Sequence, residues 1–562
     1  MTQPVSSADG FSWDAVRANW LDGLPGGRLN IAHEALDRHV QAGAGDREAL
    51  VWWRQDGQRE ALSYAALLDA SARFAGALQA RGVGLGERVC TLAPRRPEPF
   101  IAGLGALRQG AVFAPLFPVY GPQPVRQRLT VSEARVLVTT EPLYRQVIRP
   151  IRSQLPALQD IILLDGEASG AESWARCLAR AEPVPPVPTS PEFPALLHFT
   201  SGTLGPPKCV LHAHRAAAAH VASGRQVLEL APGGRHWCTA DLGWVTGVSY
   251  AMLVPLLCGA TTLIDEPAFE ARRWYRLLAQ EGIQTWVTSP TALRLLRRAG
   301  AEAAEGADLG RLRRIFSTGE PLDAALANWS RGAFGTPARN GWWQSETGAI
   351  MIAQYGDDPV APGRMGRPVP GIEMALMQQE AGVLKPVAKG EVGEIALRGG
   401  WPSQFLAYLG ETERYREAFV DGWYRSGDMA RRLPDGELQF LGRSDDVIKT
   451  RGYMVGPAEV EAVLNRHPAV AESAVAGMPH RLAHTIVAAW VVPSRSPEDP
   501  DRLRKELLAY ARRALGPAVT PRRITLVQEL PRTAGGKVRR RALVDADRDD
   551  GGTAAPDEEG GG

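Results

Sequence analysis

The sequence predicts an α/β protein with a large N-terminal domain, made of parallel-sheet subdomains and a small β-rich subdomain, and a small α+β C-terminal domain. The chain has 562 residues, too many for one hydrophobic core, so two to four domains or subdomains are expected. Strand-like and helix-like segments alternate from Leu50 to Glu182, as in parallel sheets with helices on their faces. A break at residues 442–447 separates a β-rich stretch from a compact module of about a hundred residues.

The chain begins with a leader, residues 1–45, that is expected to pack on the body through Trp13 and Trp20. Short apolar runs and apolar residues at helical spacing then predict further elements. These are a helix at 61–78, a strand at 87–92, a helix at 100–108 and a strand at 111–116. Residues 183–194 contain six prolines among twelve positions, which predicts an extended connector.

A polar loop lies between two short predicted strands, at 195–199 and 209–211. It contains three hydroxyl residues, two glycines and Lys208. Hydroxyls and free N–H groups on such a turn form a concavity for anionic oxygens, and Lys208 adds positive charge. The spacing differs from the nucleotide-binding loop G-x-x-x-x-G-K-[ST]. Taken alone, the string also fits an ordinary polar hairpin turn.

The loop is followed by a predicted helix at 211–228 that carries His212, His214 and His220. Because no Cys, Asp or Glu partner is near in sequence, these histidines are interpreted as surface or packing residues rather than metal ligands. Strand ends are predicted at 285–290 and 314–318, each followed by a loop. Ligands bind beyond the carboxyl ends of strands in open α/β sheets, so a site is expected at these loops.

The C-terminal third is divided at the break. Strands at 390–397 and 436–441 form the predicted β-rich subdomain, and a helix at 457–464, a strand at 485–492 and a helix at 500–515 form the module beyond it. The predicted domains are 1–442 and 443–545. Residues 546–562 are acidic and Gly-rich with almost no apolar side chains, so this tail is expected to be disordered.

Composition limits the functional classes. The chain is 44% hydrophobic and 22% charged with a net charge of +2, as in an ordinary soluble protein without a nucleic-acid partner. The basic run Arg539–Arg541 is interpreted as a solvated face. Five scattered cysteines without a C-x-x-C pair predict neither disulfides nor a zinc site. No signal peptide and no membrane span are seen, so a cytoplasmic protein that does not bind membranes is expected.

Six motifs occur in a fixed order along the chain. They are the loop at 199–210, Gly319-Glu-Pro321, Trp342-Trp-Gln-Ser-Glu-Thr-Gly348, Tyr424-Arg-Ser-Gly-Asp428, Arg443-Ser-Asp-Asp446 and Thr533-Ala-Gly-Gly-Lys537. In this order they resemble the adenylate-forming superfamily of acyl-CoA synthetases, adenylation domains and luciferases. Within it, Gly243–Gly247 and Trp342–Gln344 resemble the shorter bacterial acetyl-CoA synthetases. The resemblance extends from about residue 30 to 545.

The resemblance implies activation of a carboxylate by attack on the α-phosphate of ATP, which gives an acyl-adenylate and pyrophosphate. Two anions meet, so the site must supply positive charge. Lys537 would bridge the carboxylate and the α-phosphate, Arg443 would hold phosphate oxygens, and Glu346 would hold Mg²⁺. Asp428 would accept both ribose hydroxyls. The implied ATP-binding residues are Thr200, Ser201, Gly202, Thr203, Lys208, Gly319, Glu320, Pro321, Asn340, Gly341, Trp342, Trp343, Gln344, Ser345, Asp428 and Arg443.

A second step, transfer of the acyl group to CoA, is implied after the mobile C-terminal domain rotates about the hinge residue Asp445. The implied CoA-binding residues are Thr246, Arg451, Gly452 and Arg512. The expected cofactors are therefore ATP, Mg²⁺ and CoA. A lysine acetyltransferase and deacetylase acting on Lys537 are further expected partners, because acetylation would remove the charge of that lysine.

The implied acyl pocket consists of Val245, Thr246, Thr318 and Trp343. Trp343 would form a wall that limits the acid to two or three carbons, acetate first and propionate second. Thr318 stands where acetate enzymes usually carry valine. Its hydroxyl either bonds to a nearby backbone carbonyl or indicates a short acid with a polar group.

The chain also departs from the family pattern. Leu204 replaces a threonine, Asn340-Gly341 replaces Asp-Thr or Asp-Asn, and Met454 replaces an arginine. Cys209 is expected to change only strand packing. Leu204 and Asn340-Gly341 leave open a diverged inactive paralogue that serves as a binding subunit. A further alternative is an enzyme with the same adenylation step that transfers the acyl group to a carrier protein or an amine in place of CoA.

Overall fold

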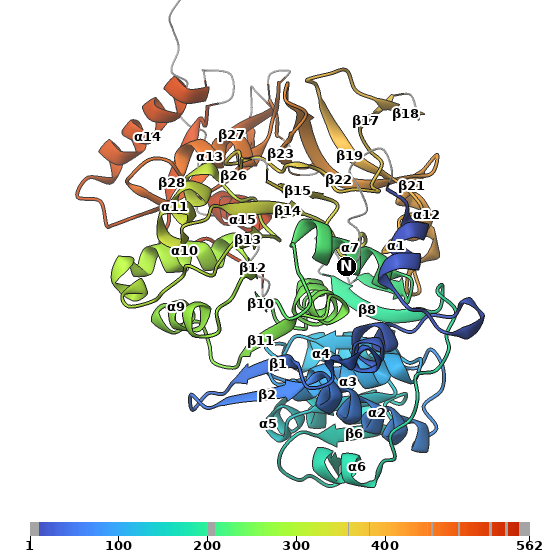
Figure 1. Ribbon diagram of the computed structural model, residues 1–562. Coiled ribbons are helices and arrows are strands. Elements are labelled where there is room, and N and C mark those ends of the chain that lie inside the picture. The colour runs from blue at the N-terminus through green and yellow to red at the C-terminus, as the bar shows by residue number, and fades with distance from the viewer. Residues whose placement is uncertain are drawn as a thin grey trace, which may run out of the picture.

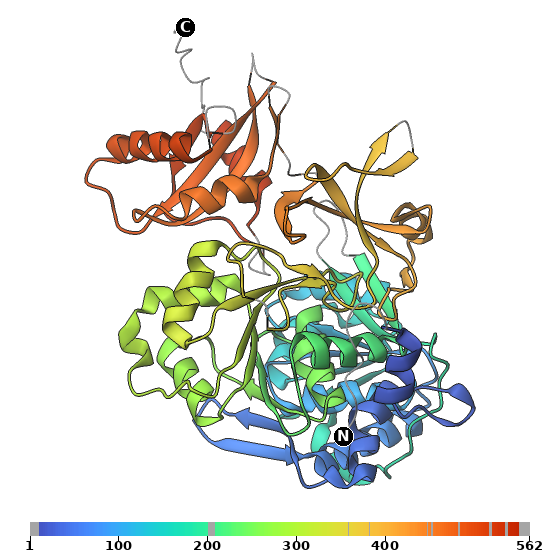
Figure 2. The same ribbon diagram turned by 45° about the horizontal axis from the view of Figure 1, so that its top comes forward.

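The computed structural model describes residues 11–200, 208–357, 359–380, 383–444, 446, 448–450, 453–480, 484–515, 520–533 and 538–549 (Figure 1). The chain folds into two large α/β sheets, a smaller antiparallel sheet and a C-terminal module. In Figure 2, the module (orange to red) and the antiparallel sheet both lie above the two large sheets. The predicted fold class is confirmed.

The first large sheet has eight strands in the order β20-β9-β8-β4-β3-β5-β6-β7. They are β3 (Arg88–Leu92), β4 (Val112–Leu116), β5 (Val136–Thr139), β6 (Asp160–Leu163), β7 (Glu172–Ser173), β8 (Pro194–Thr200), β9 (Lys208–Ala213) and β20 (Ala407–Tyr408). All neighbours are parallel except β8–β9 and β9–β20. Val89 and Phe113 enter one hydrophobic core, whereas their neighbours Cys90 and Val112 enter another, so both faces of the sheet are buried.

The second large sheet has nine strands in the order β16-β15-β14-β13-β12-β10-β11-β1-β2, parallel from β14 to β1. They are β1 (Glu48–Trp53), β2 (Arg59–Ser63), β10 (Arg235–Cys238), β11 (Thr261–Asp265), β12 (Thr285–Thr288), β13 (Arg314–Ser317), β14 (Ala338–Trp342), β15 (Ile352–Ala353) and β16 (Arg367–Pro368). Val287 and Phe316 share a core with Phe113 of the eight-stranded sheet, so this core spans the two sheets.

Helices cover these sheets. Those of the first sheet are α2 (Tyr64–Ala80), α3 (Pro97–Arg108), α4 (Pro122–Val131), α5 (Glu141–Leu143) and α6 (Trp174–Arg180). Next to the core that spans the sheets are α7 (Ala216–Ala222) and α8 (Val254–Leu257), each adjoining a π-helical segment, η6 (Ser223–Val227) and η7 (Gly247–Leu253). On the other face of the second sheet are α9 (Ala271–Gln280), α10 (Pro290–Ala299) and α11 (Ala324–Phe334).

The third sheet is antiparallel, with the order β18-β17-β19-β22-β21 and β23 paired to β22. It contains β17 (Met374–Glu380), β18 (Val383–Pro386), β19 (Val392–Arg398), β21 (Phe419–Val420), β22 (Trp423–Arg432) and β23 (Leu438–Arg443), with α12 (Thr412–Glu417) beside it. The C-terminal module contains β24 (Ile448–Thr450), β25 (Tyr453–Val455), α13 (Pro457–Leu464), β26 (Val470–His480), β27 (His484–Pro493), α14 (Pro500–Leu515), β28 (Arg523–Leu526) and α15 (Arg540–Asp549). β23 ends at Arg443, next to the predicted domain boundary.

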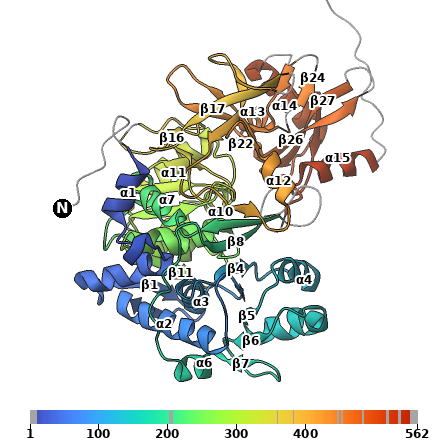
Figure 3. The ribbon, with the colours of Figure 1, turned by 90° about the vertical axis from the view of Figure 1, so that its right-hand side faces the viewer.

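The described part of the N-terminal leader, residues 11–45, packs on the body as expected. Helix α1 (Trp13–Trp20) lies beside α7 in Figure 3. Trp20 is buried, and Arg225 stacks on its ring at 5.1 Å from the centroid. Trp13 donates a hydrogen bond from Nε1 to the carbonyl of Gly371, 3.1 Å away.

Two sequence-based expectations are wrong. The helix predicted at 211–228 begins only at Ala216, because the chain stays in strand β9 to Ala213, paired with both β8 and β20. His212, His214 and His220 are buried, so they are packing residues and not surface residues. The tail was predicted to be disordered from residue 546, but its first residues, 546–549, complete helix α15, where Asp547 pairs with Arg523 at 2.8 Å. Residues 550–562 lie outside the described residues.

Within the part that the structure covers, no helix is long and apolar enough to cross a membrane.

A buried ion pair ties the leader to the first sheet. Arg108, at the end of α3, donates two hydrogen bonds to Asp37 at 2.7 and 2.8 Å and a third to the carbonyl of Val184 at 2.7 Å. Because breaking such a pair leaves a buried charge, Arg108→Ala is expected to lower the free energy of unfolding by about 3–5 kcal/mol. Urea denaturation measures this loss. Arg416→Ala, which removes the exposed Arg416–Glu413 pair, is the control and should cost only about 0–1 kcal/mol. Equal losses would contradict the structural role of the buried pair.

Candidate active site

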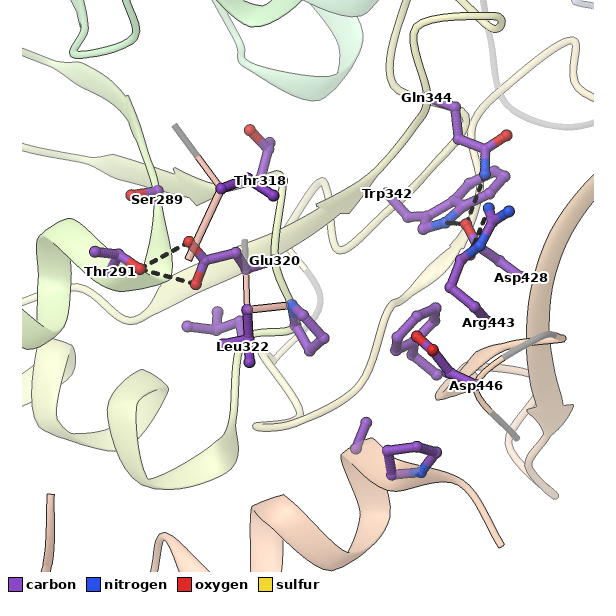
Figure 4. A pocket seen from close by; sticks show the side chains of 18 of the residues that line it. Ser289, Thr291, Thr318, Glu320, Leu322, Trp342, Gln344, Asp428, Arg443 and Asp446 are labelled. Atoms are coloured by element: carbon purple, nitrogen blue, oxygen red, sulfur yellow. Dashed lines mark hydrogen bonds and ion pairs between the residues drawn. The ribbon is translucent and has the colours of Figure 1, made fainter. Parts of the chain in front are cut away.

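One large cleft, with a volume of about 2720 Å³, brings the described parts of the chain together. Its lining comes from both large sheets, the antiparallel sheet and the C-terminal module. The ends of β12, β13 and β14 open into it, as predicted for an open α/β sheet. Figure 4 shows Ser289, Thr318 and Glu320 on one side of the cleft and Trp342, Gln344, Asp428 and Arg443 on the other.

The carboxylate of Asp428 is fixed by three donors. Trp342 Nε1 and Gln344 Nε2 donate to Oδ2 at 2.9 and 2.7 Å, and Arg443 donates to Oδ1 at 3.3 Å (Figure 4). Tyr424 in turn donates to Oε1 of Gln344 at 2.7 Å, which fixes the orientation of the amide. The carboxylate is therefore oriented at the cleft wall by three donors, as recognition of a pair of hydroxyl groups requires.

The local backbone explains why this carboxylate is preceded by glycine. Gly427 has φ of +70°, a conformation that favours glycine, and a Cβ at this position would lie 2.8 Å from the guanidinium of Arg443. Its N–H donates to Glu394 Oε1 at 2.9 Å, and the N–H of Asp428 donates to Ser426 Oγ at 3.0 Å. The turn thus lets Arg443 cross close to the backbone and reach Asp428.

A second carboxylate, Glu346, lies near the polar loop. The pairing of β20 with β9 brings Tyr408 to it, and the Tyr408 hydroxyl donates to Glu346 Oε1 at 2.7 Å. Lys208 Nζ lies 3.8 Å from the same oxygen and 5.1 Å from the centre of the Tyr408 ring. Burial lowers the pKa of Lys208, while the charge of Glu346 opposes this. Burial and the charge of Glu346 raise the pKa of Tyr408, so the phenol stays a hydrogen-bond donor.

Glu346 is suited to binding Mg²⁺, but in the described part of the chain it does not belong to a site in which several protein side chains coordinate one metal ion. Among the described residues, no group of three or more His, Cys, Asp or Glu side chains could hold a metal ion. Mg²⁺ usually binds through one or two carboxylates, with waters and substrate phosphates as its other ligands. A single carboxylate at the cleft wall fits that pattern.

The turn after β13 forms the opposite end of the cleft. Gly319 has φ of +88°. Glu320 accepts a hydrogen bond from the Thr291 hydroxyl on both oxygens, at 2.7 and 3.0 Å, and pairs with Arg294 at 3.3 Å (Figure 4). These contacts fix the turn while its backbone stays open to the cleft, where a planar ring could lie against it.

Trp343 also lines the cleft. Its indole meets the ring of Tyr250 edge to face, with centroids 5.1 Å apart and an interplanar angle of 82°. Val245, Thr246 and Thr318 line the same cleft, and Thr318 is only 4% exposed. Gly341 keeps this region open, because a Cβ there would lie 3.4 Å from Thr318 Cγ2 and 3.2 Å from Ile350 Cδ1. Trp343 thus adds an aromatic side chain to the lining that Val245, Thr246 and Thr318 share.

Comparison with protein families identifies the chain. Residues 36–409 match the AMP-binding enzyme family, and residues 459–537 match the C-terminal domain of AMP-binding enzymes. The chain belongs to this family. It is 37% identical to the acetyl-coenzyme A synthetase of Bacillus subtilis, over 92% of this chain and 90% of that protein. The predicted membership of the adenylate-forming superfamily is confirmed.

Solved structures agree with this assignment. An acyl-CoA synthetase of Brucella canis is 32% identical, with a TM-score of 0.74 over 96% of this chain and 98% of that one. An anthranilate CoA ligase in complex with anthranoyl-AMP is 26% identical, with a TM-score of 0.86 over 94% and 98%.

In this AMP-binding enzyme, most of the predicted site residues lie together. The predicted residues that the structure describes and that line the cleft are Thr200, Lys208, Val245, Thr246, Thr318, Gly319, Glu320, Pro321, Asn340, Gly341, Trp342, Trp343, Gln344, Ser345, Glu346, Asp428 and Arg443. Arg512 is exposed on α14 and is not among the lining residues. Ser201, Gly202, Thr203, Asp445, Arg451, Gly452 and Lys537 lie outside the described residues.

The sequence reasoning missed four residues that shape the site: Asp241, Tyr250, Tyr408 and Tyr424. Tyr424 begins one of the six motifs, so a polar partner could have been expected there. Tyr408 stands 62 residues after Glu346 and reaches it only through strand pairing. Nothing local in the sequence indicates that contact.

Asp241 makes the free energy of unfolding depend on pH. Its Oδ1 accepts from the Gly243 N–H at 2.8 Å, and burial raises its pKa to about 6, although this N–H and Arg95 oppose the shift. Because an unfolded aspartate has a pKa of about 4, the folded chain binds more protons between pH 4 and 6, and this group's stability contribution falls as the pH rises through that range.

Asp241→Asn keeps the acceptor for Gly243 and removes the buried charge. We expect it to raise the free energy of unfolding by roughly 1–3 kcal/mol at pH 8 and by much less at pH 5, as measured by urea denaturation. The control is Asp56→Asn, since the exposed Asp56 accepts from the N–H of Gln58 in the same kind of turn. An equal gain for Asp241→Asn at both pH values would show that burial of charge is not the cause.

Proposed function

We propose that this AMP-binding enzyme activates a short carboxylic acid, acetate first and propionate second. ATP and the acid give an acyl-adenylate and pyrophosphate, and CoA then takes the acyl group to give acyl-CoA and AMP. The observation that carries the proposal is the convergence of the motif residues on one cleft with an aromatic wall at Trp343. Support comes from relatives named acetyl-coenzyme A synthetase, which are 32–37% identical over most of their length.

In the first step the chain's own residues bind and orient ATP. Asp428, held by Trp342, Gln344 and Arg443, accepts the two ribose hydroxyls. The turn at 319–321 lies against the adenine. Thr200, Ser201, Gly202, Thr203 and Lys208 form the concavity for the phosphates, with Asn340, Gly341 and Ser345 nearby. Asp428 and its three donors are already arranged before the reaction, so they need little reorganisation as ATP binds.

Two cationic residues act at the reacting centre. Lys537 is proposed to bridge the acid's carboxylate and the α-phosphate, and Arg443 to hold phosphate oxygens as the bond forms. Glu346, oriented by Tyr408, would hold Mg²⁺, which when bound neutralises phosphate charge. Acetylation of Lys537 would remove one of these cations, so we propose a lysine acetyltransferase and a deacetylase as regulatory partners.

The second step is proposed to use a rotation of domain 443–545 relative to domain 1–442 about Asp445. Rotation would withdraw Lys537 and present a face that binds CoA through Thr246, Arg451, Gly452 and Arg512. The thiolate then attacks the carbonyl carbon of the adenylate and AMP leaves. Of these residues, only Thr246 and Arg512 are among those described, and Thr246 lines the cleft.

The proposal is tested with a panel of C2 to C6 acids, hydroxy acids included, assayed with ATP, Mg²⁺ and CoA. Pyrophosphate release with acetate that ends in acetyl-CoA supports it. Release without any use of CoA would favour transfer to a carrier protein or an amine. The variant Lys537→Ala is the control for background hydrolysis of ATP. If the parent protein releases pyrophosphate no faster than this variant, the proposal is contradicted.

Trp343→Gly tests the acyl pocket. An indole that fills the end of a packed pocket excludes carbons by steric overlap, while one methylene discriminates by only about 1–3 kcal/mol. The parent is therefore expected to use acetate best, propionate less well and butyrate hardly at all. The glycine variant should prefer acids of four carbons or more in kcat/KM across the panel. Thr318→Val is the control and should leave acetate use unchanged or improved. An unchanged ranking in the glycine variant would reject Trp343 as the wall.

A further inference from the structure

Tyr250 is the side chain against which the indole of Trp343 rests. The two rings meet edge to face, with centroids 5.1 Å apart and planes at 82°. Tyr250, on η7, is completely buried, whereas Trp343 is half-buried and lines the cleft. The phenol ring thus lies on the far side of the indole from the ligand space, at a distance where aromatic pairs attract each other.

Both ends of Tyr250 are fixed. Its hydroxyl accepts a hydrogen bond from the N–H of Ile350 at 2.7 Å and lies 2.9 Å from the hydroxyl of Ser223. Burial raises the pKa of Tyr250, so the neutral phenol can also donate to Ser223. At the backbone, His236 Nε2 lies 2.7 Å from the Tyr250 carbonyl. Three segments therefore fix the ring, and the contact with Ile350 also fixes the end of the segment that begins at Trp343.

We propose that Tyr250 is a positioning residue that sets the depth of the acyl pocket through Trp343. The inference rests on the proposed function, since it concerns which acids are accepted. A side chain that forms a wall excludes a longer acid only if it cannot retreat, and a packed interior allows retreat only into empty space. The anchored ring of Tyr250 fills the space behind the indole. The selection for short acids therefore depends on two aromatic residues, of which only Trp343 would touch the substrate.

Tyr250→Leu tests this inference because it removes the ring and leaves space behind the indole. We expect the ratio of kcat/KM for butyrate to that for acetate to rise by about tenfold or more, the effect of roughly one methylene in an apolar pocket. KM for acetate should rise, because the indole no longer closes on the methyl group. Tyr250→Phe removes the hydroxyl contacts but keeps the ring. Because the ring fills the space behind the indole, this variant should keep the parent's ranking of C2 to C6 acids.

Tyr275→Leu is the matched control for general destabilisation. Tyr275 is equally buried, on α9, but it stacks on Phe334 in the core on the other face of the nine-stranded sheet. It should lower stability without changing the butyrate-to-acetate ratio. If Tyr250→Leu does not fold, Tyr250→Met replaces it, since the flexible thioether fills volume without forming a rigid wall. The same rise in the ratio is expected.

The outcomes separate this inference from the function beneath it. If the parent prefers acetate and Trp343→Gly shifts the preference, but the folded Tyr250→Leu and Tyr250→Met variants keep the parent's ranking, Tyr250 has no positioning role. A rise of the ratio in Tyr275→Leu as large as that in Tyr250→Leu would also exclude this role. If the parent releases no pyrophosphate with any acid of the panel, the proposed function falls and this inference falls with it.

Discussion

The structure of the site depends on how the carboxylate of Asp428 is held. Asp428 belongs to β22, and Arg443 is the last residue of β23. Trp342 is the last residue of β14 in the nine-stranded sheet, and Gln344 lies two residues after it. The four side chains thus join the nine-stranded sheet to the antiparallel sheet, next to the predicted domain boundary. A carboxylate that is 6% exposed is costly unless donors compensate it, and here they come from three segments. Any change in how these sheets pack would disturb the site.

Residues 345–348 of the motif that begins at Trp342 are held in place by contacts with buried polar side chains. His212 lies 2.8 Å from the Ser345 carbonyl and 3.1 Å from that of Ser403. His220 Nε2 lies 3.0 Å from the carbonyl of Gly348, and Trp401 donates to that of Thr347 at 3.0 Å. Burial lowers the pKa of His212 and His220 to about 4, so both rings are neutral at physiological pH. They orient the backbone that presents Ser345 and Glu346, without adding charge to it.

The sequence was sufficient for the class of fold, and the residues that the family resemblance implied include many that line the cleft. Alternating apolar segments predicted parallel sheets, and the polar loops after β12 and β13 lie at the carboxyl ends of these strands, where the cleft opens. The prediction of a helix from 211 was wrong because the alanine-rich run at 216–222 gives a strong helical signal, while the pairing of β9 with β20 depends on residues two hundred positions away. Tyr250 and Tyr408 were missed for the same reason, since their contacts join distant segments and no local pattern encodes them.

The central claim is that a carboxylate oxygen attacks the α-phosphate in this cleft. The most direct test is to incubate the protein with ATP, Mg²⁺, CoA and acetate that carries ¹⁸O at both carboxylate oxygens. Mass spectrometry then measures the ¹⁸O content of the products. Because the oxygen that bonds to phosphorus stays there when CoA takes the acyl group, AMP should gain one ¹⁸O and pyrophosphate none. Label in inorganic phosphate or pyrophosphate, with unlabelled AMP or ADP, would mean attack at another phosphorus and would contradict the account.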